Sequence, residues 1–307
     1  MRALVTGGAG FIGSHVVDAL RARGDDVVAL DDLSSGRREN LAESGAELVV
    51  GDITDPDAIE EAFGRARPEL VLHLAAQIDV RRSVADPAFD LDVNVGGTIR
   101  LLERARSSGV GRFLFASTGG AIYGEGEGRK LPLTEDAERR PDAPYGQSKL
   151  AAEGYLDLYR RLYGLETRAL RLGNVYGPRQ DPHGEAGVVA IFTSALLDGR
   201  RPRVFGDGEQ TRDYIYVADV AAAFLAAADA GGPGAYNVGT GIETAVLELG
   251  RRIAEAVSVQ FDPEMVPARL GEVQRIAIDP GRAVAELGWR AERDLATGLA
   301  QTVESFR

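Results

Sequence analysis

The fold is decided by the stretch VTGGAGFIGS at residues 5–14. The apolar run at residues 3–5 predicts a strand, and the residues from Phe11 onward predict a helix. Between them, Gly8, Gly10 and Gly13 have the spacing G-x-G-x-x-G, and counting from Gly7 gives G-x-x-G-x-x-G. Glycines at these positions allow a tight turn, and they let the backbone approach a pyrophosphate that faces the helix N-terminus. An ordinary glycine-rich turn is the alternative interpretation.

An acidic residue, Asp31, ends the next apolar run at residues 27–30. A carboxylate at this point of a dinucleotide-binding fold accepts hydrogen bonds from the ribose hydroxyls of adenosine and repels a 2′-phosphate. We therefore expect NAD rather than NADP, against the alternative of a solvated aspartate at a strand end. Asp52 ends a third apolar run, where it either bonds the adenine amino group or caps its own turn.

The composition narrows the class of protein. The chain has 307 residues, 44% of them hydrophobic, and a formal net charge of −12. This charge argues against a nucleic-acid partner or an anionic membrane partner. There is no cysteine, which excludes disulfides and thiolate chemistry and makes the cytoplasm the default location. We expect no membrane span, because no run of about 20 apolar residues occurs, and we expect no signal peptide and no metal site.

The first half of the chain alternates between strand-like and helix-like runs. The predicted strands are residues 2–6, 27–31, 47–51, 70–75 and 112–117, and the predicted helices are residues 11–23, 56–65 and 87–107. Such alternation predicts an α/β fold with a doubly wound parallel sheet, the Rossmann arrangement. Ligands then bind beyond the carboxyl ends of the strands.

The second half is less regular. A helix over residues 145–163 and a strand over 166–172 are predicted first, followed by a polar loop at 173–187 and shorter elements. These are helices at 188–197, 219–229 and 245–257 and strands at 203–205, 236–238 and 265–266. We interpret residues 1–171 as a dinucleotide-binding domain, with parts of 210–240 packing back onto it. Residues 172–307 form a smaller lobe that binds the substrate.

A second strong signal is the pair Tyr145 and Lys149, four residues apart on a predicted helix. Residues at this spacing share one helix face. A free tyrosine has a pKa of about 10, and a nearby ammonium or an oxidised nicotinamide favours its phenolate. The chain has only two lysines, Lys130 and Lys149, so an ordinary surface pair at this spacing is a weak alternative.

Two hydroxyls, on Ser117 and Thr118, end the fifth predicted strand. At the carboxyl edge of the sheet, one of them is placed to bond a substrate hydroxyl. Simple capping of the strand end is an equal alternative at this point.

Together these motifs resemble the extended short-chain dehydrogenase/reductase family, and within it the UDP-glucose 4-epimerase branch. The resemblance runs along nearly the whole chain. The matching segments are residues 6–13, 31–36, 51–53, 73–77, 94–98, 117–124, 145–149, 171–178 and 212–219.

The resemblance implies a role for each matching residue. Tyr145 would be the acid–base, Lys149 its electrostatic partner, and Thr118 or Ser117 the assisting hydroxyl. Tyr145 and Lys149 would also line the NAD site with Gly7, Gly10, Phe11, Ile12, Gly13, Asp31, Asp32, Leu33, Ser34, Ser35, Gly36, Asp52, Ile53, Leu74, Ala75, Ala76, Gln77 and Asn94. The UDP group of the substrate would be held by Asn174, Val188, Arg203, Arg212 and Arg269.

One departure concerns Gly119, where many relatives carry their catalytic hydroxyl; here the hydroxyls come one and two residues earlier. A second is that Gly119 and Gly120 leave no acidic side chain at the place where dehydrating relatives have one. The expected activity is NAD-dependent 4-epimerisation of a UDP-hexose through a 4-keto intermediate. A dehydratase, decarboxylase or reductase of the same family is the first alternative, and a non-catalytic NAD-binding sensor is the second.

The resemblance also implies a homodimer, in which the helices at 87–107 and 145–163 pair with their copies across a two-fold axis. Finally, Ile276 aligns with a residue whose bulk, in some relatives, decides whether an N-acetyl group fits. A plain core position is the alternative for Ile276.

Overall fold

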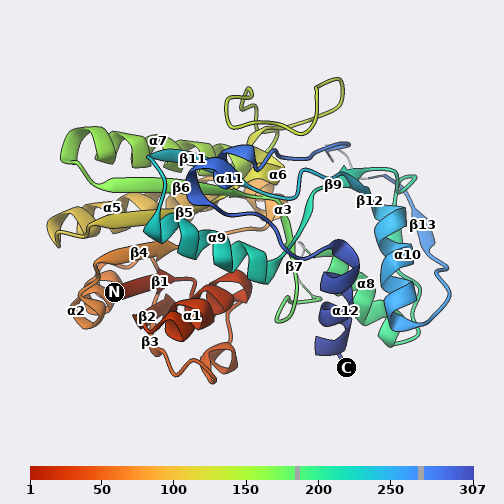
Figure 1. Cartoon of the computed structure of the whole chain (residues 1–307), viewed down its shortest axis with the longest axis horizontal. Coiled ribbons are helices and arrows are strands. Elements are labelled where there is room, and N and C mark those ends of the chain that lie inside the picture. Colours follow the sequence, from red (N-terminus) through yellow and green to blue (C-terminus); the bar gives the residue numbers. More distant parts are fainter. Residues whose placement is uncertain (184–186, 269–272) are drawn as a thin grey trace.

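The computed structural model of the chain describes residues 1–183, 187–268 and 273–307. Two lobes are visible, a larger one built on a sheet and a smaller one at the other end (Figure 1). The chain starts in the larger lobe, and its last helix, α12 (Leu295–Ser305), packs in the smaller one.

The larger lobe contains a seven-stranded sheet in the order β11-β6-β5-β4-β1-β2-β3, with every pair parallel. This confirms the predicted doubly wound sheet. The predicted bounds are right for β1 and β6 and within about two residues for the others. The strands are β1 (Arg2–Thr6), β2 (Asp26–Asp31), β3 (Glu47–Val50), β4 (Leu70–His73), β5 (Arg112–Thr118), β6 (Glu166–Leu172) and β11 (Gly234–Val238).

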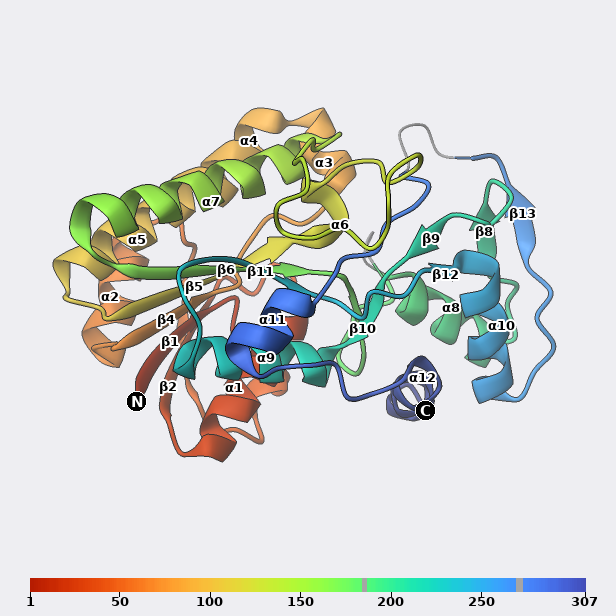
Figure 2. The ribbon, with the colours of Figure 1, turned by 45° about the horizontal axis from the view of Figure 1, so that its top comes forward.

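Helices cover both faces of the sheet (Figure 2). One face carries α1 (Phe11–Arg23), α9 (Val217–Asp229) and α11 (Gly281–Leu287). The other carries α2 (Pro56–Ala66), α5 (Gly97–Ser107) and α7 (Pro144–Tyr163). Successive strand residues point to opposite faces, so in β1 Ala3 and Val5 join the first core while Leu4 joins the second.

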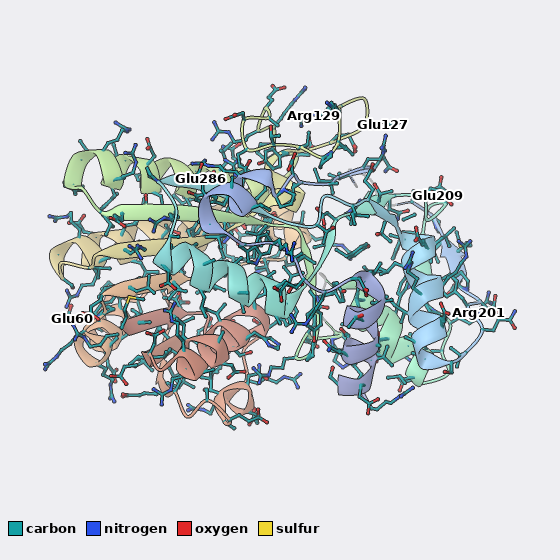
Figure 3. The ribbon with its side chains drawn as sticks, in the orientation of Figure 1. Glu60, Glu127, Arg129, Arg201, Glu209 and Glu286 are labelled. Carbon is teal, nitrogen blue, oxygen red and sulfur yellow. The ribbon has the colours of Figure 1, made fainter. Side chains whose placement is uncertain are left out.

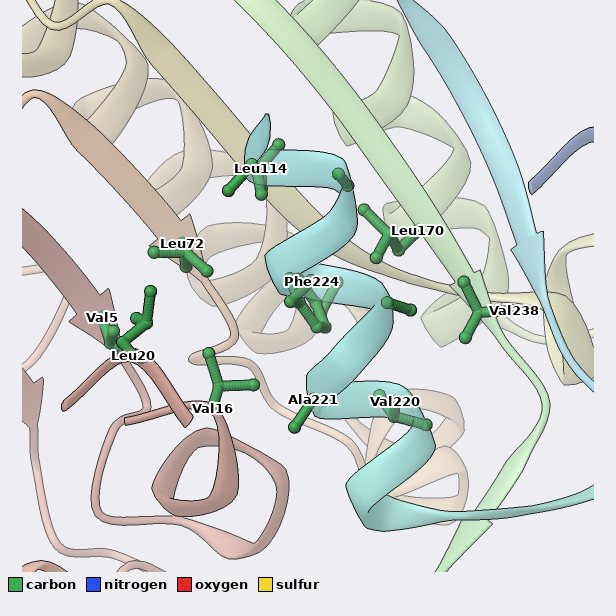
Figure 4. Close-up of a cluster of buried hydrophobic side chains, with 14 of the residues drawn as sticks. Val5, Val16, Leu20, Leu72, Leu114, Leu170, Val220, Ala221, Phe224 and Val238 are labelled. Atoms are coloured by element: carbon green, nitrogen blue, oxygen red, sulfur yellow. The ribbon is translucent and has the colours of Figure 1, made fainter. Parts of the chain in front are cut away.

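Phe224 of α9 lies near the middle of the first core, with Leu114 and Leu170 of the sheet close by (Figure 4). Its side chain is fully buried, and burial of a phenylalanine contributes about 1.5–3 kcal/mol. Both α9 and β11 come from the second half of the chain, so this half completes the larger lobe as well as building the smaller one.

The segment 87–107 is not the uniform helix that the pattern predicts. It divides into α4 (Pro87–Leu91), a π-helical stretch labelled η2 (Asp92–Gly96) and α5. Within the stretch, the backbone oxygen of Asn94 accepts a 2.6 Å hydrogen bond from Thr98 Oγ1. Single π turns within a helix re-aim side chains and are frequent at functional sites, and here Asn94 points inward and is buried.

The smaller lobe packs α8 (Val188–Leu197), α10 (Val246–Val257) and α12 around its own apolar cluster. Three two-stranded pairs lie outside the large sheet: β10 with β7, β12 with β9, and β13 with β8. These strands are β7 (Asn174–Tyr176), β8 (Arg203–Phe205), β9 (Thr211–Arg212), β10 (Tyr214–Tyr216), β12 (Thr244–Ala245) and β13 (Glu264–Val266).

Some short elements lie outside the predictions. The segment 173–187, expected as a loop, contains β7, and the sequence pattern missed α3 (Val80–Ala85), α6 (Gly119–Ile122), β9, β10, β12, α11 and α12. Strands of two or three residues are too short to show the alternation that marks a strand in a sequence. They form because they pair with a distant segment, which no local pattern indicates.

Charged side chains cover the outside of both lobes, including Glu60, Glu127, Arg129, Arg201, Glu209 and Glu286 (Figure 3). Glu60 pairs with Arg104 at 2.6 Å, and Arg201 pairs with Asp262 at 3.1 Å. Exposed pairs of this kind contribute only about 0–1 kcal/mol each.

No helix in the described ranges has both the length and the apolar character needed to cross a bilayer. Across those same ranges, no group of three acidic, histidine or cysteine side chains is arranged to hold a metal ion.

Candidate active site

The glycine loop between β1 and α1 has no room for side chains. A Cβ on Gly13 would lie 1.9 Å from the Gly7 oxygen, and one on Gly7 would lie 2.7 Å from the Ala75 nitrogen. Gly7 also has a φ of +69°, in the left-handed region that favours glycine. Gly10 is the N-cap of α1, whose first residues are Phe11 and Ile12. The loop therefore fits the close approach of a pyrophosphate to this helix end.

Asp31 lies at the carboxyl end of β2, beside this loop. Its oxygens accept 2.9 Å hydrogen bonds from the backbone nitrogens of Ala9 and Leu33. Burial raises the pKa of Asp31, and these hydrogen bonds oppose that effect. A Cβ on Gly36 would come within 2.5 Å of Asp31 Oδ1, so the chain wraps closely around the carboxylate. The wrapping loop contains the other predicted cofactor residues of this stretch, Asp32, Leu33, Ser34 and Ser35.

Asp52 caps its own turn, because its Oδ1 accepts a 2.7 Å hydrogen bond from the Thr54 nitrogen. The turn lies next to Asp31, whose backbone oxygen accepts a 3.0 Å bond from Gly51. Ile53 is buried, and its Cδ1 would lie 2.7 Å from a Cβ on Gly97. The structure thus places both predicted residues at the edge of the sheet that holds the glycine loop.

The segment after β4 is held to Asn94 by paired amide hydrogen bonds. The Gln77 nitrogen donates to Asn94 Oδ1 and Asn94 Nδ2 donates to the Gln77 oxygen, both at 2.9 Å. Leu74 donates to the Thr6 oxygen at 3.0 Å. The predicted residues Leu74, Ala75, Ala76 and Gln77 therefore line the same edge as the glycine loop.

Lys149 lies in the second turn of α7 and is buried. Its Nζ donates a 2.9 Å hydrogen bond to the Ala116 oxygen on β5 and lies 4.6 Å from the ring centroid of Phe115. Burial lowers the pKa of Lys149 to about 8, and the charges of Asp90 and Glu153 act in the opposite direction. The ammonium is therefore aimed at the carboxyl end of β5.

Tyr145 lies one turn before Lys149 on the same helix, as the spacing predicts. Burial and the charge of Asp90 raise the pKa of Tyr145 to about 12, while its hydrogen bond with Thr118 lowers it. Burial is thus the largest influence on the pKa of Tyr145 in this structure.

The two hydroxyls at the end of β5 point in different directions. Ser117 donates a 2.6 Å hydrogen bond to Glu153 Oε1 and is buried, whereas Thr118 bonds Tyr145. Glu153 is itself paired with Arg171, with Nη2 and Oε2 2.7 Å apart. Neighbouring strand residues alternate between faces, and this alternation separates the two hydroxyls.

The residues predicted for the substrate come from β7, α8, β8 and β9. Asn174 lies close to the carboxyl end of β5: a Cβ on Gly120 would be 3.4 Å from Asn174 Oδ1 and 3.9 Å from Thr118 Oγ1. Val188 is the first residue of α8. In the smaller lobe, Arg203 is exposed and pairs with Glu264 at 3.7 Å, and Arg212 Nη1 donates to the Thr211 oxygen at 2.8 Å. Arg269 lies outside the described residues.

Two further positions that the sequence singles out are Gly119 and Ile276. A Cβ on Gly119 would lie 2.6 Å from Ile278 Cδ1, so a hydroxyl-bearing side chain there needs Ile278 to move. Ile276 is 1% exposed and packs in a small cluster with Ile122, Tyr123, Leu133 and Ile278. This burial is the behaviour of a core residue.

Sequence reasoning missed three buried charged residues around this site, Asp90, Glu153 and Arg171. Glu153 carries one available signal, since it continues the Tyr145–Lys149 spacing by another four residues. Asp90 lies four residues before its partner Asn94, whereas the partners of Arg171, Glu153 and Tyr123, come from distant segments.

Comparison with known proteins agrees with this geometry. The profile of the "NAD dependent epimerase/dehydratase family" matches residues 3–239. A UDP-glucose 4-epimerase of Mycolicibacterium smegmatis is 52% identical over 312 aligned residues, which cover 100% of this chain and 99% of that protein.

Two solved structures extend the likeness to the fold. A UDP-glucose 4-epimerase of Thermotoga maritima with UDP-glucose is 47% identical, with a TM-score of 0.96 over 100% of this chain and 98% of that one. A UDP-glucose 4-epimerase of Thermus thermophilus in complex with NAD is 45% identical, with a TM-score of 0.95, and the match covers 100% of this chain and 99% of that one. These matches confirm the family resemblance, and the chain belongs to the NAD dependent epimerase/dehydratase family.

Proposed function

We propose that this chain catalyses the NAD-dependent 4-epimerisation of a UDP-hexose and interconverts UDP-glucose and UDP-galactose. The observation that carries the proposal is the contact of Tyr145 with Thr118 at the carboxyl edge of the sheet, with Lys149 buried one turn away. The glycine loop opens on the same edge. Similarity over the whole chain to epimerases solved with NAD and with UDP-glucose supports the same activity.

NAD is the cofactor that fits the β1–α1 loop. Gly7 and Gly13 let the backbone of this loop pack more tightly than any side chain would allow, and Asp31 offers carboxylate oxygens where a 2′-phosphate would be repelled. NAD bound there supplies a reversible hydride acceptor. Gln77, Asn94 and Lys149 would hold the nicotinamide half.

The chain's own residues handle the proton. Tyr145 would act as the phenolate, the form that the Lys149 ammonium and an oxidised nicotinamide favour. It would take the proton of the sugar 4-hydroxyl and return it after the 4-keto sugar has turned over, so no net proton is gained. Thr118 would bond the same substrate oxygen and hold it in line with the phenol. Lys149 would bond ribose hydroxyls and, as an ammonium, stabilise negative charge on Tyr145.

The uridine diphosphate would be held by Asn174, Val188, Arg203, Arg212 and Arg269. A guanidinium matches phosphate oxygens in geometry and charge, which offsets the net charge of −12 on the whole chain. These anchors grip the nucleotide rather than the sugar. A loosely held 4-keto sugar is free to rotate, so that either face of its ring can be turned toward the nicotinamide.

Two other functions are less well supported. Dehydration needs an acidic side chain just beyond Thr118, where Gly119 and Gly120 have none. A non-catalytic NAD sensor does not need the contact between Tyr145 and Thr118.

We also propose the functional organisation. Residues 1–171, with parts of 210–240, bind NAD, and residues 172–307 bind the UDP-sugar in the cytoplasm. The functional unit would be a homodimer, because α3, α4 and α7 pack together and expose large apolar side chains. These are Val80 (44% exposed), Val84 (63%), Leu91 (57%) and Tyr155 (37%).

The test starts with identification of the nucleotides released from the denatured purified protein. The protein is then incubated with UDP-galactose and followed by NMR. We expect bound NAD, growth of UDP-glucose signals, and no net change in the redox state of NAD. A 4-keto-6-deoxy product, a pentose product or unchanged substrate with NAD bound would reject the proposal.

A further inference from the structure

A buried carboxylate lies beside the Tyr145–Lys149 helix and has no part in the function proposed above. Asp90, in α4, has no exposed surface. Its Oδ1 accepts hydrogen bonds from Gln77 Nε2 at 2.9 Å and Asn94 Nδ2 at 3.0 Å, and its Oδ2 accepts one from Ser148 Oγ at 2.6 Å. In the described part of the chain Asp90 forms no ion pair. Burial of a charge without a cationic partner is costly, and packing alone would be served better by a neutral group.

The three partners of Asp90 belong to two different parts of the site. Gln77 and Asn94 hold the segment after β4 through their paired amides. Ser148 lies on α7 directly before Lys149. One carboxylate therefore ties the proposed nicotinamide side of the cofactor site to the helix that carries the acid–base.

The charge of Asp90 also acts on both members of the pair. It raises the pKa of Lys149 against the effect of burial, and it raises the pKa of Tyr145. Glu153, also on α7, acts on Lys149 in the same direction. His73 on β4 is neutral, because burial and Lys149 lower its pKa well below 6.5.

Other charged groups on the elements packed against α4 face outward. Arg81 and Arg82 of α3 are exposed. Asp92 pairs with Arg100 at 3.3 Å near the surface. Asp90 and Glu153 are thus the acidic groups that act on Lys149 from within the protein.

We propose that Asp90 is a positioning residue, which fixes Gln77, Asn94 and Ser148 in one cluster and whose buried negative charge keeps Lys149 an ammonium beside Tyr145. The inference rests on the roles of Tyr145 and Lys149 in the proposed function.

The chain offers a direct test because it has only two lysines, Lys130 and Lys149. Protein labelled with ¹³C in lysine gives two side-chain NMR signals, which Lys130→Arg assigns. A pH titration at equal NAD loading gives the midpoint of Lys149, and exposed Lys130 serves as an internal reference. In Asp90→Asn we expect the Lys149 midpoint to fall by about one pH unit, because one nearby negative charge is lost in a desolvated site.

Ser148→Ala is the matched control, since it removes a hydrogen bond from the cluster and keeps the charge. It should weaken NAD binding and leave the Lys149 midpoint near that of the unmodified protein. Asp90→Ser also removes the negative charge, and it replaces the carboxylate with a smaller hydroxyl side chain. If Asp90→Asn folds poorly, Asp90→Ser must lower the Lys149 midpoint by the same amount.

An unchanged Lys149 midpoint in the Asp90 variants, or an equal shift in Ser148→Ala, would overturn the proposal. The titration needs no turnover, so its outcome is separate from the test for epimerisation.

Discussion

At the scale of single residues, the proposed chemistry depends on one phenol. Tyr145→Phe keeps the ring and its packing and removes the group that exchanges a proton. We expect NAD content to be retained and turnover to fall by about 10²–10⁴-fold, the usual contribution of general acid–base catalysis. Tyr163→Phe, on the same helix and 52% exposed, is the control and should stay near full activity. NMR of UDP-galactose conversion measures both, and near-full turnover in Tyr145→Phe would remove it from the acid–base role.

The two hydroxyls of β5 should separate into one that affects rate and one that affects stability. Thr118→Val removes the partner of Tyr145 and should slow turnover. Ser117→Ala removes the 2.6 Å donor to buried Glu153 and should lower the free energy of unfolding by about 1–3 kcal/mol. Turnover and urea denaturation of each variant distinguish them. If Ser117→Ala alone is slow, Ser117 and not Thr118 is the assisting hydroxyl.

The lowered pKa of buried His73 should make the stability of the protein depend on pH. It is hydrogen-bonded to Thr6 and Thr98, and burial, with help from Lys149, lowers its pKa well below 6.5. As the pH falls below 6.5, the unfolded chain takes up a proton that the folded protein does not, so stability falls with the pH.

For His73 alone, the free energy of unfolding falls by at most about 1.4 kcal/mol for each unit by which the pH is lowered. Urea denaturation of the unmodified protein and of His73→Gln at pH 7.5, 6.5 and 5.5 measures this contribution as the difference between the two slopes. Equal slopes for the two proteins would contradict the assignment.

At the scale of elements, two glycines with opposite surroundings give opposite predictions. Gly13 opens α1, and a Cβ there would meet the Gly7 oxygen at 1.9 Å. Since that neighbour is backbone, Gly13→Ala should abolish NAD binding and lower the unfolding midpoint. Gly64 lies in α2 with nothing within 4 Å of its added Cβ, so Gly64→Ala should raise the free energy of unfolding by about 0.5–1 kcal/mol. Calorimetric NAD titration and thermal unfolding measure both; normal NAD affinity in Gly13→Ala would argue against the loop as the pyrophosphate site.

At the scale of the whole molecule, the exposed apolar face of α3, α4 and α7 predicts a two-fold dimer. Light scattering at micromolar concentration should give twice the chain mass. Leu91→Glu, on this face, should give a monomer, because a charge cannot be buried there without a partner. Ile242→Glu is the control, since Ile242 is 64% exposed in the smaller lobe and its change should leave the mass unaltered. A monomer mass for the unmodified chain would refute the dimer.

The amino-acid sequence predicts most strands of the larger lobe, the glycine loop, Asp31 at the end of β2, and the helix face that Tyr145 and Lys149 share. These features are local: a strand or helix shows its own period, a tight turn requires glycine, and residues four apart share a helix face. Such signals need no knowledge of what lies across the fold.

The partners that these residues meet depend on the tertiary structure. It formed the short strand β7 inside an expected loop, and it turned Ser117 toward Glu153 and Thr118 toward Tyr145. It also brought Gln77 and Ser148, from two other segments, to the carboxylate of Asp90. Pairing, burial and the charge around a buried group depend on segments far apart in the chain, and no local pattern of residues records which distant segment arrives.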